Sequence, residues 1–252
     1  MRAVRSAVDF ALLARVVTLA GAAVFAIGWT LALGKDVHWD AINYHLYLGF
    51  SALHDRFAQD FFAAGPPAYL NPYAYVPLYL AVAAGWSAWA IAAALAAWHS
   101  LTLWLTYEIA LVAGAPRTAR VHVAFALLAV AFAATNPVLL QVLGSTTADL
   151  TTAVLVLGGW WCVAVAVRDG RASLACLAGV LVGAAAAMKL SNAVFAMAAA
   201  PALLFVEGTL QRKVLVQLGF GLACGIAFLA AAMPWGAQLW RVRQHVAVAV
   251  GV

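Results

Sequence analysis

Long apolar runs separated by short polar connections dominate this chain and limit the folds open to it. Of its 252 residues, 67% are apolar and 9% are charged, and the mean hydropathy is +0.97. A soluble domain with so few charges could not cover its surface, so the composition indicates a polytopic membrane protein. An α-helix needs about 20 mostly apolar residues to cross the hydrocarbon core. The runs therefore predict an all-α transmembrane bundle of about seven spans. The expected spans are residues 12–33, 88–112, 120–140, 148–167, 172–190, 193–207 and 214–233.

The basic residues and the cysteines exclude two other classes. The net charge is +5, but Lys and Arg fall in small groups between apolar runs and form no basic stripe, which argues against nucleic-acid binding. Cys162, Cys176 and Cys224 all lie inside apolar runs without metal-ligand spacing. We therefore expect small buried residues there and no disulfide framework.

The arginines and lysines also set the expected topology. Residues 16–33 are too long for the apolar part of a signal peptide and lack a clean small-residue cleavage site, so they predict an uncleaved first span. Residues 72–84 are apolar but short. If they do not cross, the basic residues of the N-terminus and of the loops near residues 117, 168 and 212 share one face, as expected of the cytoplasmic side. We therefore predict that 72–84 is a juxtamembrane or re-entrant piece.

This topology places the polar segments together on the opposite, outer face. The largest, residues 34–72, holds four of the nine acidic residues and three of the six histidines. Ionisable groups are costly in lipid, so a concentration of them indicates a functional site. We expect one membrane domain over 1–252, with an outer loop at 34–87, further spans over 88–233 and an irregular tail at 234–252.

Residues 40–55 predict an interfacial helix with one apolar face, since Ile42, Leu46, Phe50 and Leu53 recur at helical spacing. Asp40 is either its N-cap or a carboxylate that acts as a general base or binds a divalent cation. His38, His45 and His54 match no metal-binding spacing, so no metal site is assigned, and a divalent cation stays an alternative.

Lys189 lies at the outer end of an apolar run, where it either extends to the membrane surface or pairs with phosphate or with Asp149. Asp149 in turn either caps its own helix or makes that pair. Glu108, His99 and His122 lie within spans, and we expect packing, pairing or loop roles for them.

Several short motifs follow one another in order on the outer face. A first span precedes a large loop with Asp36 and Asp40, and the motifs that follow are Asn43-Tyr44-His45-Leu46-Tyr47, Asp60, Tyr69-x-Asn71-Pro72, Ser145-Thr146-Thr147-x-x-Asp149 and Lys189-Leu190-Ser191-Asn192. Over residues 12–235, the chain resembles the integral-membrane glycosyltransferases of the GT-C superfamily. That family is defined more by topology than by strict motifs.

The resemblance implies transfer of a sugar, a hexose or a pentose, from a polyprenyl-phosphate carrier to an acceptor hydroxyl on the outer (periplasmic) face of a bacterial inner membrane. The N-terminus would be cytoplasmic, the prenyl tail would lie in an apolar groove between spans, and membrane lipid would be the other partner. Asp40 would activate the acceptor, with Asp36 as its rival, while Lys189 and Arg56 stabilise the departing phosphate. The expected substrate-binding residues are His38, Asn43, Tyr44, His45, Arg56, Asp60, Tyr69, Asn71, Asp149, Lys189 and Asn192.

The chain departs from the family at its C-terminal end, because members usually continue with several more spans. We therefore expect either a fragment, inactive alone, or a reduced member. Two alternatives stay open: a transporter-like protein, which would need polar groups through the bilayer or inverted repeats, and a non-catalytic membrane scaffold.

Overall fold

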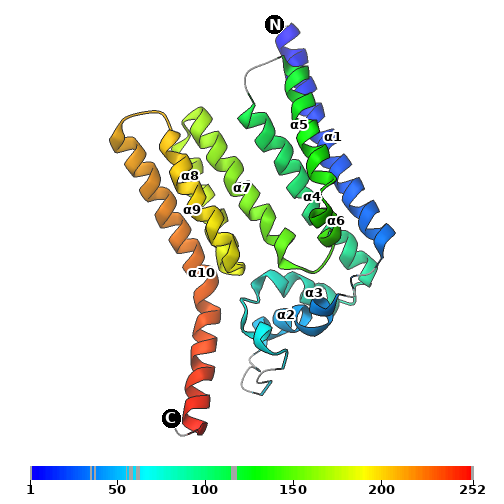
Figure 1. Cartoon of the computed structure of the whole chain (residues 1–252), viewed down its shortest axis with the longest axis vertical. Helices are drawn as coiled ribbons and strands as arrows, with labels where there is room; N and C mark the ends of the chain where they lie inside the picture. The colour runs from blue at the N-terminus through cyan, green and yellow to red at the C-terminus, as the bar shows by residue number, and fades with distance from the viewer. Residues whose placement is uncertain are drawn as a thin grey trace.

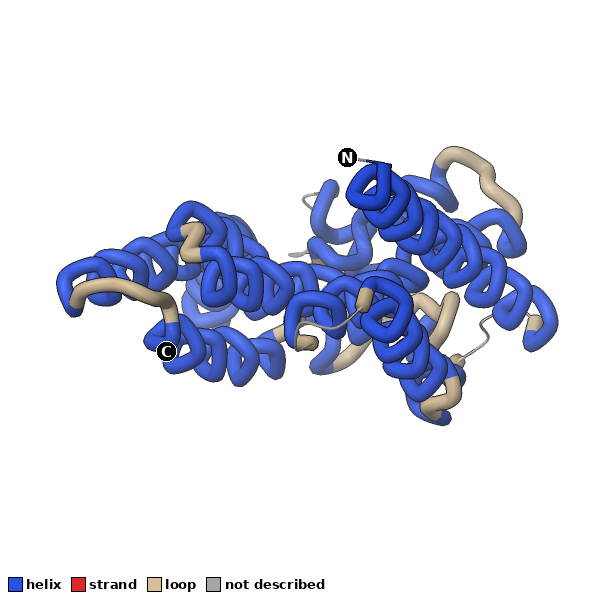
Figure 2. The backbone as a smooth tube through the Cα atoms, turned by 90° about the horizontal axis from the view of Figure 1, so that it is seen from above, coloured by secondary structure: helices blue, strands red, loops and turns tan. Residues whose placement is uncertain are grey.

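A computed structural model describes residues 2–34, 36, 38–54, 56, 59–60, 63–114 and 118–250. Within these ranges every regular element is a helix, joined by turns and short loops, and no residue lies in a strand, which confirms the all-α class (Figures 1 and 2). The α-helices are α1 (Arg2–Leu33), α2 (Leu46–Leu53), α3 (Val76–Ala83), α4 (Ala88–Ala113), α5 (Ala119–Ala134), α6 (Pro137–Val142), α7 (Ala148–Asp169), α8 (Ala172–Met188), α9 (Ala193–Ala202) and α10 (Leu210–Val250).

The long helices form an elongated bundle in which α1 and α10 lie on opposite sides (Figures 1 and 2). Neighbouring helices pack in the order α1, α4, α7, α8 and α10, while α5 covers α4 and α9 covers α8. Four of the described helices, α1, α4, α7 and α10, are long and apolar enough to cross a membrane. The seven expected spans fall on these four and on the shorter apolar helices α5, α8 and α9. That the shorter three also cross stays a prediction.

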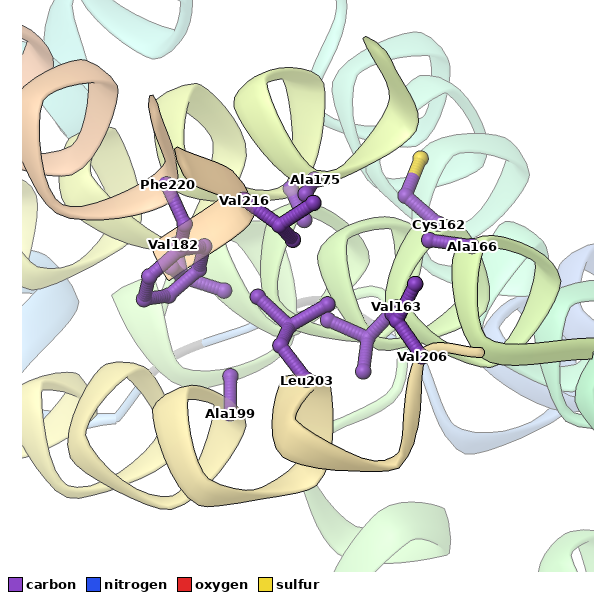
Figure 3. Close-up of a cluster of buried hydrophobic side chains, with 11 residues drawn as sticks. Cys162, Val163, Ala166, Ala175, Val182, Ala199, Leu203, Val206, Val216 and Phe220 are labelled. Atoms are coloured by element: carbon purple, nitrogen blue, oxygen red, sulfur yellow. The ribbon is translucent and has the colours of Figure 1, made fainter. Parts of the chain in front are cut away.

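The half of the bundle formed by α7 to α10 surrounds an apolar core (Figure 3). Side chains from these helices and from the turn after α9 meet there, among them Val163, Val182, Leu203 and Phe220. In lipid there is little hydrophobic force between helices, so close packing of small residues must hold them together. Gly179 and Gly183 supply it, because a Cβ on either would overlap a backbone carbonyl oxygen of α10.

The apolar piece at 72–84 does not continue into a span. It forms a short 3-10 turn, Tyr73–Tyr75, followed by α3, and the chain then reverses at Gly85 (φ 77°) into α4. Helices α2 and α3 pack against each other at one end of the bundle (Figure 1). Gly49 permits this contact, since a Cβ there would lie 2.6 Å from the Cβ of Tyr79. The geometry agrees with a juxtamembrane segment.

Four local interpretations of the sequence do not hold. The helix of the expected span 120–140 ends at Ala134, and Cys176 is exposed. Asp40 is not an N-cap: it has helical dihedrals (φ −62°, ψ −42°) and no capping hydrogen bond, because the helix already includes Trp39 and passes through a π-helical turn, Ala41–His45, into α2. Residues 234–250 are not irregular, since α10 continues through Pro234 to Val250. A proline removes one backbone hydrogen bond and kinks a helix, but the residues from 237 to 250 contain no further Gly or Pro to end it.

Candidate functional site

The candidate site lies where the first loop meets the beginning of α7. Asp36 and Thr146 form the main link between them. One carboxylate oxygen of Asp36, Oδ2, accepts hydrogen bonds from the backbone N–H and from the hydroxyl of Thr146, both at 2.8 Å. Its other oxygen, Oδ1, accepts from the backbone N–H of His38 at 3.1 Å. Three donors on one carboxylate fix the loop firmly, since hydrogen bonds to charged groups are the stronger kind.

His45 forms the second link. Its Nδ1 lies 2.7 Å from the hydroxyl oxygen of Thr146, and its side chain is almost fully buried. The imidazole stacks on the ring of Tyr75 at 4.6 Å and meets the edge of Tyr44 at 4.6 Å. An apolar cluster of Leu48, Tyr75 and the first residue of α7, Ala148, continues this contact. The loop is thus packed onto α7 as well as hydrogen-bonded to it.

The charges in this region are shaped by burial and by these contacts. Burial alone would raise the pKa of Asp36, but the hydrogen bonds from Thr146 and His38 outweigh it and the pKa lies below its usual range. Burial lowers the pKa of His45, despite the opposing effect of nearby Asp40 and Asp36, so the imidazole is neutral at neutral pH. Burial, the charge of Asp40 and a hydrogen bond to that carboxylate raise the pKa of Tyr44 to about 12.

Asp149 and Lys189 complete the group. Asp149 lies in the first turn of α7 and Lys189 directly after α8, and their side chains form an ion pair. This is the pair that one of the sequence alternatives expected. Asp149 also acts electrostatically on Tyr44, His45 and Tyr75, which places it beside them. We call these residues the α7 cluster: Asp36, Asp40, Tyr44, His45, Tyr75, Thr146, Asp149 and Lys189.

Two apolar grooves adjoin the α7 cluster. One, of about 190 Å³, runs between α2, α3 and the start of α4, and Asp36 and Thr146 line it together with apolar residues such as Leu46 and Leu78. The other, of about 480 Å³, runs along α7 beside α6 and α9, and Asp149 and Asn192 line it. Both grooves combine a few polar groups with long apolar walls, a composition that suits a ligand with an apolar tail.

The other expected site residues divide into four sets, of which three are described first. Asn43 donates to Trp39 O (2.7 Å) within its own helix, and His38 is exposed beside Asp36. Arg56 and Asp60 pair with each other at 3.0 Å on the exposed part of the loop. Asn192 is buried, and its side-chain amide donates to Thr152 Oγ1 and to Ala185 O, so it holds the turn between α8 and α9 against α7.

Tyr69 and Asn71 anchor the loop to α10. The amide of Asn71 donates to Ala231 O at 2.9 Å, and the indole N–H of Trp235 donates to Tyr69 O at 3.1 Å. The side-chain oxygen of Asn71 also accepts from the backbone N–H of Tyr73. These contacts give the Tyr-x-Asn-Pro motif an architectural role.

The three titratable residues expected within spans are placed as follows. Glu108 is buried and pairs with Arg15 of α1 at 2.8 Å. His99 accepts a hydrogen bond from Gly144 N at its Nδ1 and lies 3.1 Å from the hydroxyl of Thr151. The Nε2 atom of His122 is buried without a hydrogen-bond partner against α4, close to Gly114. The pairing role expected for Glu108 is present.

Sequence reasoning did not assign two members of the cluster, Thr146 and Tyr75. Thr146 is separated from Asp36 by 110 residues and from His45 by 101, and it stands between two residues of similar type, Ser145 and Thr147. The only sequence signal for Thr146 was its place in the polar run that follows an apolar stretch.

The described residues contain no group of three or more His, Cys, Asp and Glu side chains that could hold a metal ion.

No protein-family model matches this chain, and comparison with curated proteins and with solved structures found no match. The resemblance to GT-C glycosyltransferases therefore depends on this chain's own residues and is a proposal.

Proposed function

We propose that this chain is a membrane glycosyltransferase that moves a sugar from a polyprenyl-phosphate carrier to an acceptor hydroxyl. The observation that carries the proposal is the α7 cluster, where carboxylates and one lysine converge beside two apolar grooves. A lipid-linked phosphosugar needs both features: an apolar surface for its tail and a cation for its phosphate. Four helices long and apolar enough to cross a membrane provide the setting.

In this proposal Asp40 is the proton acceptor. The acceptor hydroxyl attacks the anomeric carbon of the sugar while its proton passes to Asp40, and the bond from that carbon to the phosphate oxygen breaks. The phosphate leaves with the bonding electrons. Lys189 then exchanges its ion pair with Asp149 for the departing phosphate and stabilises the developing charge.

The arginine distribution supports a cytoplasmic N-terminus and a site on the outer face of a bacterial inner membrane. The α7 cluster lies at the end of the bundle reached by the C-terminal end of α1 and the N-terminal ends of α4 and α7 (Figure 1). The loops near Arg168 and Arg212 join α7 to α8 and α9 to α10 at the other end. This separation of the acidic cluster from the basic loops is what the proposed orientation requires.

The test is sugar transfer by the purified chain in lipid nanodiscs, with radiolabelled polyprenyl-phosphate hexose or pentose as donor and membrane lipid extract as acceptor. Asp40→Asn should lower the rate by about 10²- to 10⁴-fold, because it removes the general base but keeps the shape. Asp169→Asn is the matched control, since this carboxylate pairs with Arg168 at the far end of α7. Transfer at the wild-type rate by the Asp40 variant, or no consumption of either donor, would contradict the proposal.

A further inference from the structure

Thr146 has a hydrogen-bonding role that its position in the sequence does not reveal. A threonine hydroxyl has a single proton to donate. Here that proton goes to the Asp36 carboxylate, at 2.8 Å, so the hydroxyl oxygen can only accept from His45 Nδ1, at 2.7 Å. The imidazole must then have its proton on Nδ1, which leaves Nε2 as the unprotonated nitrogen.

The bridge continues from His45 to Asp40 through one further residue. The imidazole is clamped between Tyr75 on one face and the edge of Tyr44, both with ring centres at 4.6 Å. Tyr44 lies one helical turn after Asp40, and the charge of the Asp40 carboxylate acts on its phenol. Neighbouring side chains therefore connect the turn before α7 to Asp40, by way of Thr146, His45 and Tyr44.

Asp36 and Asp40 differ in how far they are engaged. Asp36 receives three hydrogen bonds, two of them from backbone N–H groups, and these stabilise its charged form. A carboxylate stabilised in this way is a poor proton acceptor. Asp40 is half-buried, and among the described residues its side chain neither caps the helix nor forms an ion pair, so it is less engaged than Asp36.

We propose that Thr146 is a positioning residue: by bridging Asp36 and His45 it fixes the Nδ1–H tautomer of His45 and holds Asp40 in place through Tyr44. The proposal assigns the rival carboxylates different roles, with Asp36 fastening the loop and Asp40 taking the proton. Its catalytic half depends on the proposed glycosyltransferase function, whereas the hydrogen-bonding half does not. Among the described residues, the charged and titratable groups facing His45 are Asp36, His38, Asp40, Tyr44 and Asp149, together with Tyr75.

The experiment compares Thr146→Val, which removes the hydroxyl, with Thr146→Ser, which keeps it. Thr106→Val is the matched control, since the Thr106 hydroxyl donates only to Thr102 O within its own helix. Nitrogen-15 NMR of imidazole-labelled protein in nanodiscs reports the tautomer, and the His45 signal is the one that disappears in His45→Phe. We expect the Nδ1–H tautomer in the wild type, in Thr146→Ser and in Thr106→Val, and its loss in Thr146→Val.

In the transfer assay, Thr146→Val should lower kcat by about 10- to 100-fold, the effect of losing a hydrogen bond to a charged group, with little change in KM for the donor. Thr146→Ser should restore most of kcat. Asp40→Asn should lower the transfer rate by about 10²- to 10⁴-fold while leaving the Nδ1–H tautomer of His45 unchanged, which separates positioning from catalysis.

Each half can fail separately. A wild-type His45 protonated at Nε2 overturns the tautomer assignment, whatever the activity. Unchanged kcat in Thr146→Val, or a rise confined to KM, overturns the positioning role. If the wild-type chain transfers neither sugar while the NMR result is as expected, the glycosyltransferase proposal and the catalytic half fail together, and the hydrogen-bonded bridge stands.

Discussion

Replacing Gly183 by alanine tests how α8 and α10 are held together. The new Cβ would overlap the carbonyl oxygen of Cys224 and approach its carbonyl carbon and Cα to 3.0 Å. These are backbone atoms, so the helices must separate, by about 1 Å, which forfeits a quarter to a half of the dispersion energy across the contact. Overpacking of this kind costs about 1–3 kcal/mol. The better helix propensity of alanine offsets about 1 kcal/mol of it, so the net loss is about 0–2 kcal/mol, and about 1–3 kcal/mol relative to a glycine-to-alanine change without the overlap.

Gly225→Ala on α10 is the matched control, because a Cβ there meets no atom within 4 Å. It should be neutral or slightly stabilising. Unfolding in mixed micelles with increasing SDS, followed by tryptophan fluorescence, suits this region because Trp160 and Trp161 pack against the same core. If Gly183→Ala unfolds at the same SDS fraction as Gly225→Ala, the close approach of α8 and α10 is wrong.

Three further outcomes are expected. Gly144→Ala should lower stability by about 2 kcal/mol or more, because Gly144 has a φ of 73° and a Cβ would overlap the side chain of Thr30; a thermal melt in detergent checks this. Asn71→Ala should speed amide hydrogen exchange over residues 63–73 without lowering the melting temperature of the bundle, because it removes the bond to Ala231 O; unchanged exchange would refute the anchoring role. The lowered pKa of Asp36 contributes stability that is present above its ordinary value of 3.8 and lost as the pH falls through the lower folded value. Asp36→Asn should therefore flatten the acid limb of a stability-versus-pH curve, and an identical limb in both proteins would contradict this.

The helices were predictable because their cause is local. Each expected span overlaps an apolar helix, although 120–140 and 193–207 extend past the ends of α5 and α9, and charge placement alone indicated that 72–84 stays at one end. The errors came from effects that a hydropathy pattern does not register. Pro234 looked like an end, yet a single proline interrupts only one backbone hydrogen bond, and α10 continues. Asp40 resembled an N-cap in the sequence because no sequence pattern indicates the π-helical turn at 41–45 or a helix that already begins at Trp39.

The site could be located from the sequence but not assembled from it. The expected topology placed Asp36, Asp40, Asp149 and Lys189 on one face of the membrane, but it could not say which of these side chains are in contact. Arg56 and Asp60 were expected on the same face, and they form an ion pair with each other.

The choice among Ser145, Thr146 and Thr147 shows what was missing. All three hydroxyls stand in one polar run, and only the turn before α7 decides where each lies. The Ser145 hydroxyl hydrogen-bonds Val142 O and the Thr147 hydroxyl, both within three residues of it, whereas the Thr146 hydroxyl donates to Asp36, 110 residues away in the sequence. That turn depends on Gly144, whose positive φ and close approach to Thr30 exclude a side chain. The packing of Gly144 against α1 therefore sets the turn that brings the Thr146 hydroxyl, and not its neighbours, to Asp36. This hydrogen bond depends on the packing of helices far apart in the sequence, which no short motif encodes.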